Sequence, residues 1–205
     1  MSKQRFTRMQ LLVGAAGLEK LQAASVAVFG VGGVGSYAVE ALVRAGVGKL
    51  TLVDFDAVCI TNINRQIHAL DGTIGQQKVV AMAERCRAIN PQIEVVAVAV
   101  RYSAENSAEL LVAGFDYVLD CIDDITAKLH LIQSCHQRGL PIIASMGAAN
   151  KLDPSQVQVA DLENTKKCRL ARIIRKELRK RGIERGIKVV FSTEEFRPLA
   201  HGEGE

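Results

Sequence analysis

The hexapeptide Gly30-Val31-Gly32-Gly33-Val34-Gly35 constrains the fold of this chain more than any other segment. It follows the apolar run Ser25–Phe29 and opens an apolar-periodic stretch that extends to Ala45, so we predict a turn between a buried strand and a helix. In such a turn the first glycine allows a tight bend, the next lets the backbone approach a phosphate, and the last permits close helix–sheet packing. The free N–H groups of the helix amino terminus favour an anion. The candidate phosphate-binding residues are Gly30, Gly32, Gly33 and Gly35.

The rest of the chain alternates strand-like with helix-like segments. Further strands are predicted at Leu50–Val53, Glu94–Val100, Tyr117–Ile122, Pro141–Ser145, Gln156–Val159 and Lys188–Ser192. Helices are predicted at Gln76–Ile89, from a cap at Ser103 to Val112, at Thr126–Arg138 and in the basic segment after Lys166. This alternation predicts an α/β fold, a Rossmann-like doubly wound, mostly parallel sheet with helices on both faces.

The chain is expected to form one globule with three parts. Residues 1–24 are predicted to be a helical arm, residues 25–163 the nucleotide-binding domain, and residues 164–205 a basic helix with a terminal strand that belongs to the same globule. Residues Met1 to Gln10 are polar and basic, so we expect no signal peptide there, and no uncharged apolar run in the sequence is long enough for a spanning helix. Five cysteines without a C-x-x-C pair argue against a zinc ribbon and favour a reducing, cytoplasmic compartment.

Positive charge is concentrated near the carboxyl terminus. Between Lys166 and Lys188 there are eleven Lys or Arg residues against two acids, so this segment has a net charge of +9. Because the whole chain has a net charge of +4, the remainder has a net charge of −5. Its apolar residues form one helical face, at Leu170, Ile173, Ile174 and Leu178. We expect the cations to contact RNA phosphates, with a solvated helix face and an anionic membrane surface as alternatives. Without interleaved aromatic residues, base stacking by this helix is not indicated.

Polar residues beyond the second predicted strand distinguish two kinds of nucleotide site. Asp54 is placed to accept hydrogen bonds from ribose hydroxyls, which a nicotinamide-dependent oxidoreductase would also use. A nicotinamide site, however, has no need of the polar cluster Thr61–Gln66, whereas a triphosphate does. Arg65 is suited to a bidentate grip on phosphate oxygens, and Asn64 and Gln66 to fixing their direction. The cluster therefore favours ATP.

Three further charged residues are candidates for the same site. Lys78, near the start of a predicted helix, would meet the triphosphate. Asp123 closes a predicted strand and would hold Mg²⁺ against the phosphates, while Asp124 is available to cap the helix that follows. For Asp56, loop capping and nucleotide contact remain equally open. Asp120 is expected to point into the structure.

Taken in order, these motifs resemble the ubiquitin-activating-enzyme-like superfamily, which includes the adenylyltransferases of thiamine and molybdopterin biosynthesis. The matching motifs are G-x-G-G-x-G, D-x-D, N-x-N-R-Q, the lysine of Gly75-Gln76-Gln77-Lys78 and D-C-x-D. Within the superfamily, the segments Asn62–Leu70, Asp153–Val159 and Phe191–Glu194 are similar to the tRNA threonylcarbamoyladenosine dehydratase branch. The resemblance covers roughly Arg5 to Arg197.

This resemblance implies an ATP- and Mg²⁺-dependent enzyme that adenylates the carboxylate of threonylcarbamoyladenosine in tRNA and promotes its cyclisation. The alternative within the superfamily is adenylation of the carboxyl terminus of a ubiquitin-like sulfur carrier. The resemblance assigns phosphate contact to the glycine turn, Asn64, Arg65 and Lys78, ribose contact to Asp54, and the metal and α-phosphate to Asp123. Arg5-Phe6-Thr7-Arg8 is similar to an N-terminal R-[YF]-x-R motif whose second arginine reaches the partner's ATP site, so Arg8 is a candidate ligand in a homodimer.

Two residues near these motifs have more ordinary alternatives. His68 is expected to be packed in a loop rather than catalytic. Cys168 lies where some relatives carry a thioester-forming cysteine, and its basic neighbours would lower its pKa, but an incidental cysteine is the favoured interpretation. The zinc-binding cysteine pairs of molybdopterin-type members are absent, so no metal beyond Mg²⁺ is expected. Dehydratases of this type usually continue beyond the region where this chain stops, so we expect a short member or a piece of a longer chain.

Overall fold

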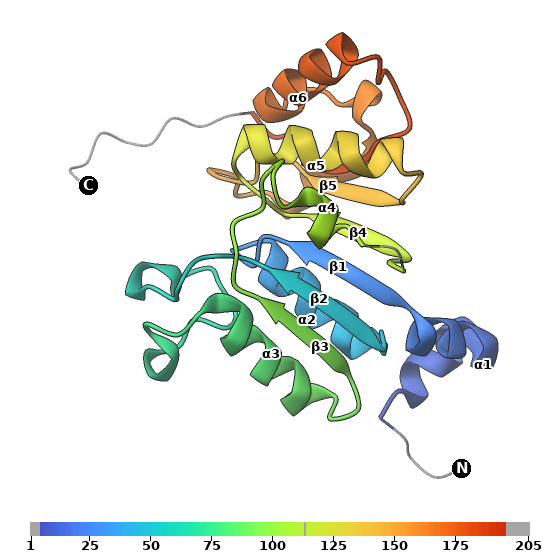
Figure 1. The fold of residues 1–205 in the computed structure, drawn as a ribbon, viewed down its shortest axis with the longest axis vertical. Helices are drawn as coiled ribbons and strands as arrows, with labels where there is room; N and C mark the ends of the chain where they lie inside the picture. Colours follow the sequence, from blue (N-terminus) through green and yellow to red (C-terminus); the bar gives the residue numbers. More distant parts are fainter. Residues whose placement is uncertain (1–4, 113, 196–205) are drawn as a thin grey trace.

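A seven-stranded sheet organises the computed structural model, which describes residues 5–112 and 114–195 (Figure 1). Its strand order is β3-β2-β1-β4-β5-β7-β6. β1 to β5 and β7 are parallel, and β6 pairs antiparallel with β7 at one edge. The strands are β1 (Ser25–Phe29), β2 (Lys49–Val53), β3 (Glu94–Val98), β4 (Tyr117–Asp120), β5 (Ile142–Ser145), β6 (Val157–Asp161) and β7 (Lys188–Ser192).

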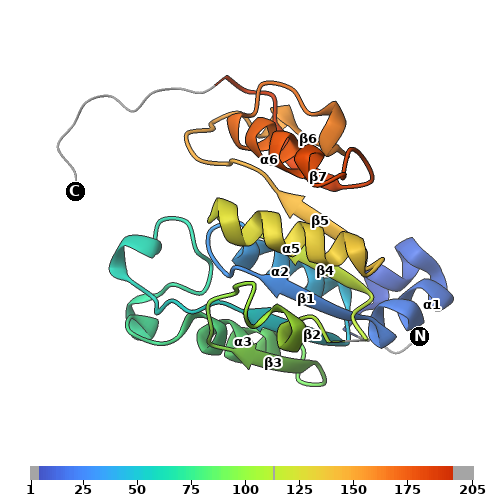
Figure 2. The same ribbon diagram turned by 45° about the horizontal axis from the view of Figure 1, so that its top comes forward.

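Helices cover the sheet from both sides, as the alternating pattern predicts (Figure 2). They are α1 (Thr7–Ala23), α2 (Gly35–Ala45), α3 (Lys78–Ile89), α4 (Ser107–Leu110), α5 (Ile125–Gln137) and α6 (Arg169–Lys180). Short 3₁₀ turns lie at Ile60–Asn62, Asp71–Thr73, Pro154–Gln156 and Leu162–Asn164. Within the described ranges, no helix combines the length and apolar character needed to cross a bilayer.

Two cores form because side chains alternate along each strand. Val26 and Val28 of β1 pack with α2 and α3 on one face, whereas Ala27 and Phe29 pack with α5 and α6 on the other. The basic helix α6 belongs to this second core through the side chains of Ala171, Ile174 and Leu178. The carboxyl-terminal helix therefore shares a core with the central strands.

The face of the sheet that packs against α2 and α3 is less covered near β6 than the alternation of strands and helices predicts. The core under α2 and α3 extends no farther than β4, where Tyr117 and Leu119 are partly buried. Beyond it, on the strand β6, Val157 and Val159 are 52% and 62% exposed. Their cross-strand partners on β7 share this face. This face is thus open at Val157 and Val159 on the edge strand, whereas Ser192 of β7 is buried.

The segment after β3 differs from its predicted structure. A helix from Ser103 to Val112 was expected, but α4 spans only Ser107–Leu110. The Ser103 N–H donates to Asn106 Oδ1 at 2.8 Å, and Asn106 Nδ2 donates to the Arg101 carbonyl at 2.8 Å. These local bonds hold the first residues as a turn, because an asparagine side chain competes with the helical backbone. The other predicted elements are present, with bounds that differ by a few residues.

Candidate active site

A cavity of about 750 Å³ opens along the carboxyl edge of the parallel strands. The loops that follow β1 to β5 line it, and Leu170 at the start of α6 closes one side. Crevices at this edge are where open α/β sheets bind ligands. The predicted residues that line it are Gly30, Gly32, Gly33, Asp54, Asp56, Arg65, Gln66, Lys78 and Asp123. Gly35 and Asn64 do not belong to the lining.

The glycine turn is shaped by close backbone contacts. Gly30 has a φ of +86°, and a Cβ there would lie 2.7 Å from the Cys121 carbonyl oxygen. A Cβ on Gly35 would lie 1.9 Å from the Gly30 carbonyl oxygen, so Gly35 serves the packing of α2 rather than the cavity. At Gly32 the nearest atom to such a Cβ is Gln66 Nε2 at 4.0 Å. The turn therefore leaves open space beside Gly32, where a phosphate would approach the backbone.

The two acids of D-x-D have different partners. Asp54 Oδ2 accepts a hydrogen bond from the Val31 N–H at 2.7 Å, and Oδ1 accepts one from the Asp56 N–H at 2.9 Å. Asp54 thus braces the glycine turn as well as lining the cavity. Asp56 forms an ion pair with Lys78, whose Nζ lies 2.6 Å from Asp56 Oδ2. The Lys78 side chain is only 7% exposed, so its charge is directed into the site.

Some residues of the N-x-N-R-Q cluster line the cavity, and others hold the loop in place. Arg65 is exposed in the lining, and its guanidinium donates to the Thr61 carbonyl at 2.8 Å and to Asn64 Oδ1 at 3.0 Å. Asn64 therefore orients Arg65 instead of facing the cavity. Asn62, which sequence reasoning did not single out, lines the cavity, and its Oδ1 accepts the Cys59 N–H at 3.1 Å.

Gln66 carries the clearest sign of a missing polar partner. The residue is 5% exposed and lines the cavity, yet its Oε1 is buried without a hydrogen bond in the described structure. Buried polar atoms are nearly always satisfied, and a ligand donor or a water at the cavity wall is one way to satisfy this acceptor. A nucleotide hydroxyl or amino group has this chemistry.

Asp123 and Asp124 have different surroundings in the structure. Asp124 Oδ1 accepts the Ala127 N–H at 2.7 Å and so caps α5. Asp123 is exposed in the cavity, and its carboxylate makes no hydrogen bond or ion pair with any described residue. Its oxygens are thus available to a ligand.

Besides Asn62, two further features of the site were missed by sequence reasoning. Arg101 lies just beyond β3, with its guanidinium carbon 5.3 Å from the centre of the Phe55 ring, and both residues line the cavity. Beneath the cavity, Lys128 and Asp120 form a fully buried ion pair at 2.8 Å. Burial raises the pKa of Asp120, and Lys128 opposes the rise. Asp120 points inward, as predicted. The sequence around Lys128 gave no indication that its side chain is fully buried.

Thiols and imidazoles near the site are poorly suited to nucleophilic catalysis. Burial, with the charge of Asp120, raises the pKa of the cavity-lining Cys121 to about 12. Cys168 is buried, and its Sγ accepts the Ala171 N–H at 3.5 Å as the cap of α6. His68 is 1% exposed and outside the lining, and burial lowers its pKa to about 4, helped by Lys78 and Arg85. Cys121 therefore stays protonated at neutral pH, and burial keeps Cys168 and His68 out of the cavity.

Comparison with known proteins agrees with this geometry. The model of the ThiF family matches residues 5–193. The chain belongs to the ThiF family. It is 50% identical over 190 residues to a tRNA threonylcarbamoyladenosine dehydratase of Bacillus subtilis, covering 93% of this chain and 75% of that protein. A molybdopterin-synthase adenylyltransferase of Salmonella typhimurium is 37% identical over 166 residues, covering 80% of this chain and 65% of that protein.

A solved structure shows the same fold with a nucleotide. The crystal structure of the Escherichia coli tRNA N6-threonylcarbamoyladenosine dehydratase in complex with ATP matches this ThiF-family chain with a TM-score of 0.90 and 41% identity. The match covers 94% of this chain and 82% of the other. The Rossmann-like α/β fold predicted from the glycine turn is thereby confirmed.

The N-terminal arginines of this ThiF-family chain lie far from its own cavity. Arg5 donates to the carbonyl of Ile89 at the end of α3, and the Phe6 ring lies beside Gly46 at the end of α2. Because α2 and α3 return the chain to the amino edge of the sheet, these contacts hold α1 at that edge, beside the start of β1 (Figure 1). The cavity lies at the opposite, carboxyl edge. Arg8 is exposed there and does not line the cavity of its own chain.

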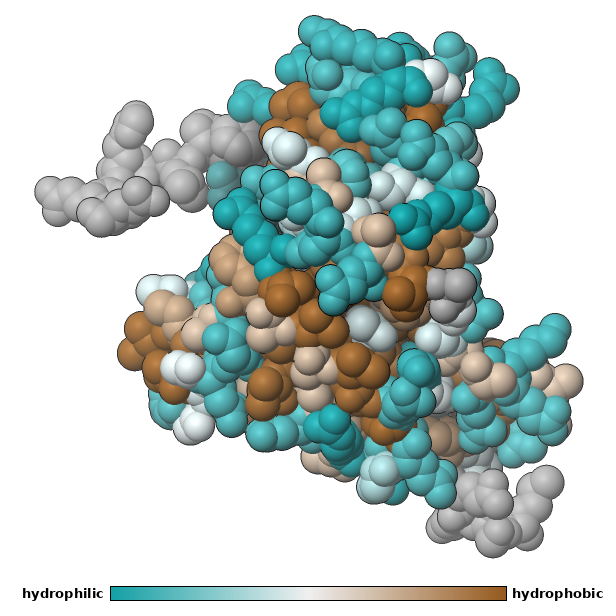
Figure 3. All heavy atoms as spheres, in the orientation of Figure 1, coloured by the Kyte–Doolittle hydropathy of each residue, from teal (hydrophilic) through white to brown (hydrophobic). Residues whose placement is uncertain are grey.

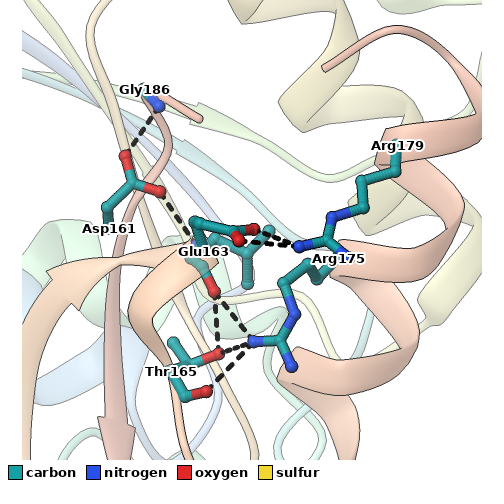
Figure 4. Close-up of polar contacts among 7 residues, drawn as sticks. Asp161, Glu163, Thr165, Arg175, Arg179 and Gly186 are labelled. Atoms are coloured by element: carbon teal, nitrogen blue, oxygen red, sulfur yellow. Dashed lines mark hydrogen bonds and ion pairs between the residues drawn. The ribbon is translucent and has the colours of Figure 1, made fainter. Parts of the chain in front are cut away.

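The basic segment of the ThiF-family chain contains two kinds of cation. Figure 4 shows Arg175 donating to the Thr165 hydroxyl at 2.6 Å and Arg179 paired with Glu163 at 2.6 Å. Arg175 also donates to the carbonyls of Leu162 and Thr165, both at 3.1 Å. These arginines tie α6 to the loop before it. By contrast, Arg172 and Lys176 are exposed and form no ion pair within the described residues.

Proposed function

We propose that this protein is an ATP-dependent dehydratase that adenylates the carboxylate of threonylcarbamoyladenosine in tRNA and promotes its cyclisation. The observation that carries the proposal is one cavity that gathers Arg65, Lys78 and Asp123 beside the open face of Gly32. Two cations and an unpaired carboxylate at a phosphate-binding turn suit a metal-bound triphosphate. Membership of the ThiF family and 50% identity to a named dehydratase support the substrate.

In the first step, a carboxylate oxygen of the substrate attacks the α-phosphorus of ATP. The bond from that phosphorus to the bridging β-phosphate oxygen breaks, and pyrophosphate leaves with the bonding electrons. Arg65 and Lys78 would offset the charge that grows on the leaving group, and the glycine turn would hold the phosphates by backbone N–H groups. The products are an acyl-adenylate and pyrophosphate.

In the second step, an internal atom of the modification attacks the activated carbonyl carbon. AMP leaves with the former carboxylate oxygen, the ring closes and one proton is released, so the nucleoside has lost the elements of water. This sequence needs no protein nucleophile. The raised pKa of Cys121 supports that feature, because the thiol in the cavity stays protonated at neutral pH.

Mg²⁺ fits this site as a metal shared with the nucleotide. No group of three or more histidine, cysteine or acidic residues that would hold a metal is present in the described chain, so a cage built from protein alone is not supported. Mg²⁺ instead commonly binds one or two carboxylates together with phosphates and waters. Asp123 would hold it, and the bound ion would neutralise phosphate charge.

A homodimer would complete the site in this proposal. Arg8 lies opposite its own cavity, so it would serve the cavity of a second copy. The apolar surface supports such an assembly, since Leu11 and Leu12 on α1 are 72% and 79% exposed and the β6 edge is uncovered. The substrate tRNA would lie along Arg172 and Lys176 of α6, where Figure 3 shows a hydrophilic surface. We place the reaction in the cytoplasm, where all five cysteines would remain free thiols.

The decisive test supplies the purified protein with ATP, Mg²⁺ and tRNA that carries threonylcarbamoyladenosine. Nucleoside mass spectrometry should show the loss of one water from the modified nucleoside, with AMP and pyrophosphate formed in equal amounts. Carrier-dependent ATP–pyrophosphate exchange with a ubiquitin-like protein, and no mass change in the tRNA, would contradict the proposal.

A further inference from the structure

The cavity extends well beyond the residues that the nucleotide motifs account for. Along the strand order, the motifs occupy the ends of β2 and β1, and Asp123 follows β4. On the other side of β4 the lining continues through Ser145, Met146, Gly147, Ala148 and Ala149 after β5, and ends at Leu170 of α6. We call these six residues the acceptor lobe. Asp123 therefore stands between the phosphate side of the cavity and this lobe.

The acceptor lobe differs chemically from the phosphate side. None of its six side chains is ionisable, whereas Arg65, Lys78 and Arg101 line the other part. A second polyphosphate would be poorly held in the lobe for this reason. Small residues leave room, and the partly exposed Leu170 offers apolar surface to a planar ring. The lobe thus suits a neutral, largely apolar group.

The wall of the lobe is held rigidly at its start. Lys128 Nζ donates to the Ser145 carbonyl at 3.0 Å while it pairs with Asp120, which joins α5, β4 and β5 beneath the lobe. The Met146 N–H donates to the Val190 carbonyl at 2.8 Å. At the other side, a Cβ on Gly147 would lie 3.7 Å from Leu170 Cβ, so the loop and α6 are in near contact. The first turn of α6 is therefore part of the cavity wall.

We infer that the acceptor lobe binds the base of the modified nucleoside, with Leu170 as a specificity-determining contact. This inference rests on the proposed function. An attacking carboxylate must reach the α-phosphate from the side away from the leaving pyrophosphate. The proposed function places the pyrophosphate at Arg65 and Lys78, and the lobe lies on the other side of Asp123. The same helix that supplies Leu170 exposes Arg172 and Lys176 outside the cavity. One RNA strand can thus lie along α6 while its base turns into the lobe.

The test is Leu170→Trp, which fills the lobe with a larger ring. The KM for modified tRNA should rise at least tenfold, while the Kd of ATP with Mg²⁺, measured by calorimetry without tRNA, should change less than twofold. Ile173→Trp is the matched control, because Ile173 lies on the same helix outside the lining and is exposed. Its KM for modified tRNA should stay within threefold of the wild-type value.

A second variant covers the case in which Leu170→Trp fails to fold. Gly147→Ala adds one methyl group that faces Leu170 at ordinary contact distance, and it should raise the KM for modified tRNA severalfold without changing ATP affinity. Equal losses of ATP and tRNA binding would assign the lobe to the nucleotide and overturn the inference, as would an unchanged KM in both variants. Failure of the proposed function looks different, because the wild-type protein would then leave modified tRNA unchanged.

Discussion

The Lys78 ammonium lies 2.6 Å from the Asp56 carboxylate, so the lysine expected to meet phosphate already has an anionic partner. The two side chains differ in exposure, 7% for Lys78 and 44% for Asp56. The partly exposed Asp56 carboxylate therefore pairs with the mostly buried Lys78 ammonium. A triphosphate at Gly32 would offer Lys78 a second anion, and the balance between these two partners links nucleotide binding to stability.

Replacing Asp56 by Asn should lower the free energy of unfolding by about 1–2 kcal/mol, because a mostly buried ammonium loses its charged partner. The deficit should shrink when ATP and Mg²⁺ are saturating, since phosphate then pairs with Lys78. Urea denaturation with and without nucleotide measures both quantities. A deficit that is the same under the two conditions would show that the lysine does not contact the nucleotide.

The double variant Asp56→Asn/Lys78→Met provides the control for this pair. With both charges removed, the loss of stability should be smaller than the sum of the two single losses. ATP should then have no effect on the difference between the double variant and Lys78→Met. Strict additivity would mean that the 2.6 Å ion pair contributes nothing in solution.

Asp123 and Asp124 both line the cavity, but in the described part of the chain only Asp124 has protein partners, the Ala127 N–H and the Arg101 guanidinium. Asp123→Asn should reduce kcat by roughly 10²-fold, in the range found for lost electrostatic contacts, with no change in stability because the carboxylate has no partner among the described residues. Asp124→Asn should retain most of the activity and reduce stability by less than about 1 kcal/mol, because Asn also caps helices. Steady-state kinetics and thermal melting of both variants test the assignment. Loss of kcat in Asp124→Asn alone would reverse the two roles.

Much of the fold was predictable because two local signals agree. The glycine turn requires a strand before it and a helix after it, and β1 and α2 follow that rule. The predicted length of α4 was wrong because the Asn106 side chain forms hydrogen bonds with the backbone of Ser103 and Arg101. The hydrophobic periodicity of the sequence does not indicate such side-chain bonds. The uncovered face at Val159 was likewise hidden, since a strand pattern does not show which helix covers it.

The site was predictable where a motif places residues at the end of a strand. Asp54 and Asp123 reach the cavity in this way, whereas Lys78 reaches it from the first residue of α3. Asn64 does not, because the turn directs it to Arg65. Arg101 was missed although it lies just after β3, since a single cation beyond a strand is a weak signal. Burial of Lys128 depends on Asp120, eight residues earlier, and only the packed sheet brings them together.

Some cations of α6 bond to the preceding loop and others are exposed, so we predict different effects when each kind is replaced. Arg172→Ala with Lys176→Ala should weaken tRNA binding and reduce the slope of log Kobs against log[salt] by about 1.5, since two phosphate contacts are lost. Stability should be unchanged. Filter binding over a range of salt concentrations, with melting temperatures as a check, measures both effects.

Arg175→Ala is the matched control for that pair. Removing a guanidinium that donates to Thr165 and Leu162 should cost about 1–3 kcal/mol of stability while leaving the salt slope unchanged. If instead Arg175→Ala changes the slope and the exposed pair does not, RNA binds elsewhere.

Arg8 should act on a second copy of the chain. Arg8→Ala and Lys78→Met should each be inactive, but mixed subunits would form dimers in which one site has both cations. Equal mixing should restore roughly a quarter of wild-type turnover, because half the dimers are mixed and each holds one complete site. Subunits are exchanged under mild denaturant and assayed after refolding. An inactive mixture, with mixed dimers shown by mass, would place Arg8 outside the site.

His68 should make the protein sensitive to acid. Burial lowers its pKa in the folded state to about 4, while the unfolded chain has the ordinary value of 6.5. Between these pH values His68 is protonated in the unfolded state but neutral in the folded state, so protonation favours unfolding. The contribution of neutral His68 to the free energy of unfolding is therefore complete above pH 6.5 and is lost as the pH falls toward 4. From pH 7.5 to pH 5 the wild-type protein should lose about 2 kcal/mol more than His68→Gln, which cannot titrate. Parallel pH profiles in urea denaturation would mean that the imidazole is solvated in the folded protein.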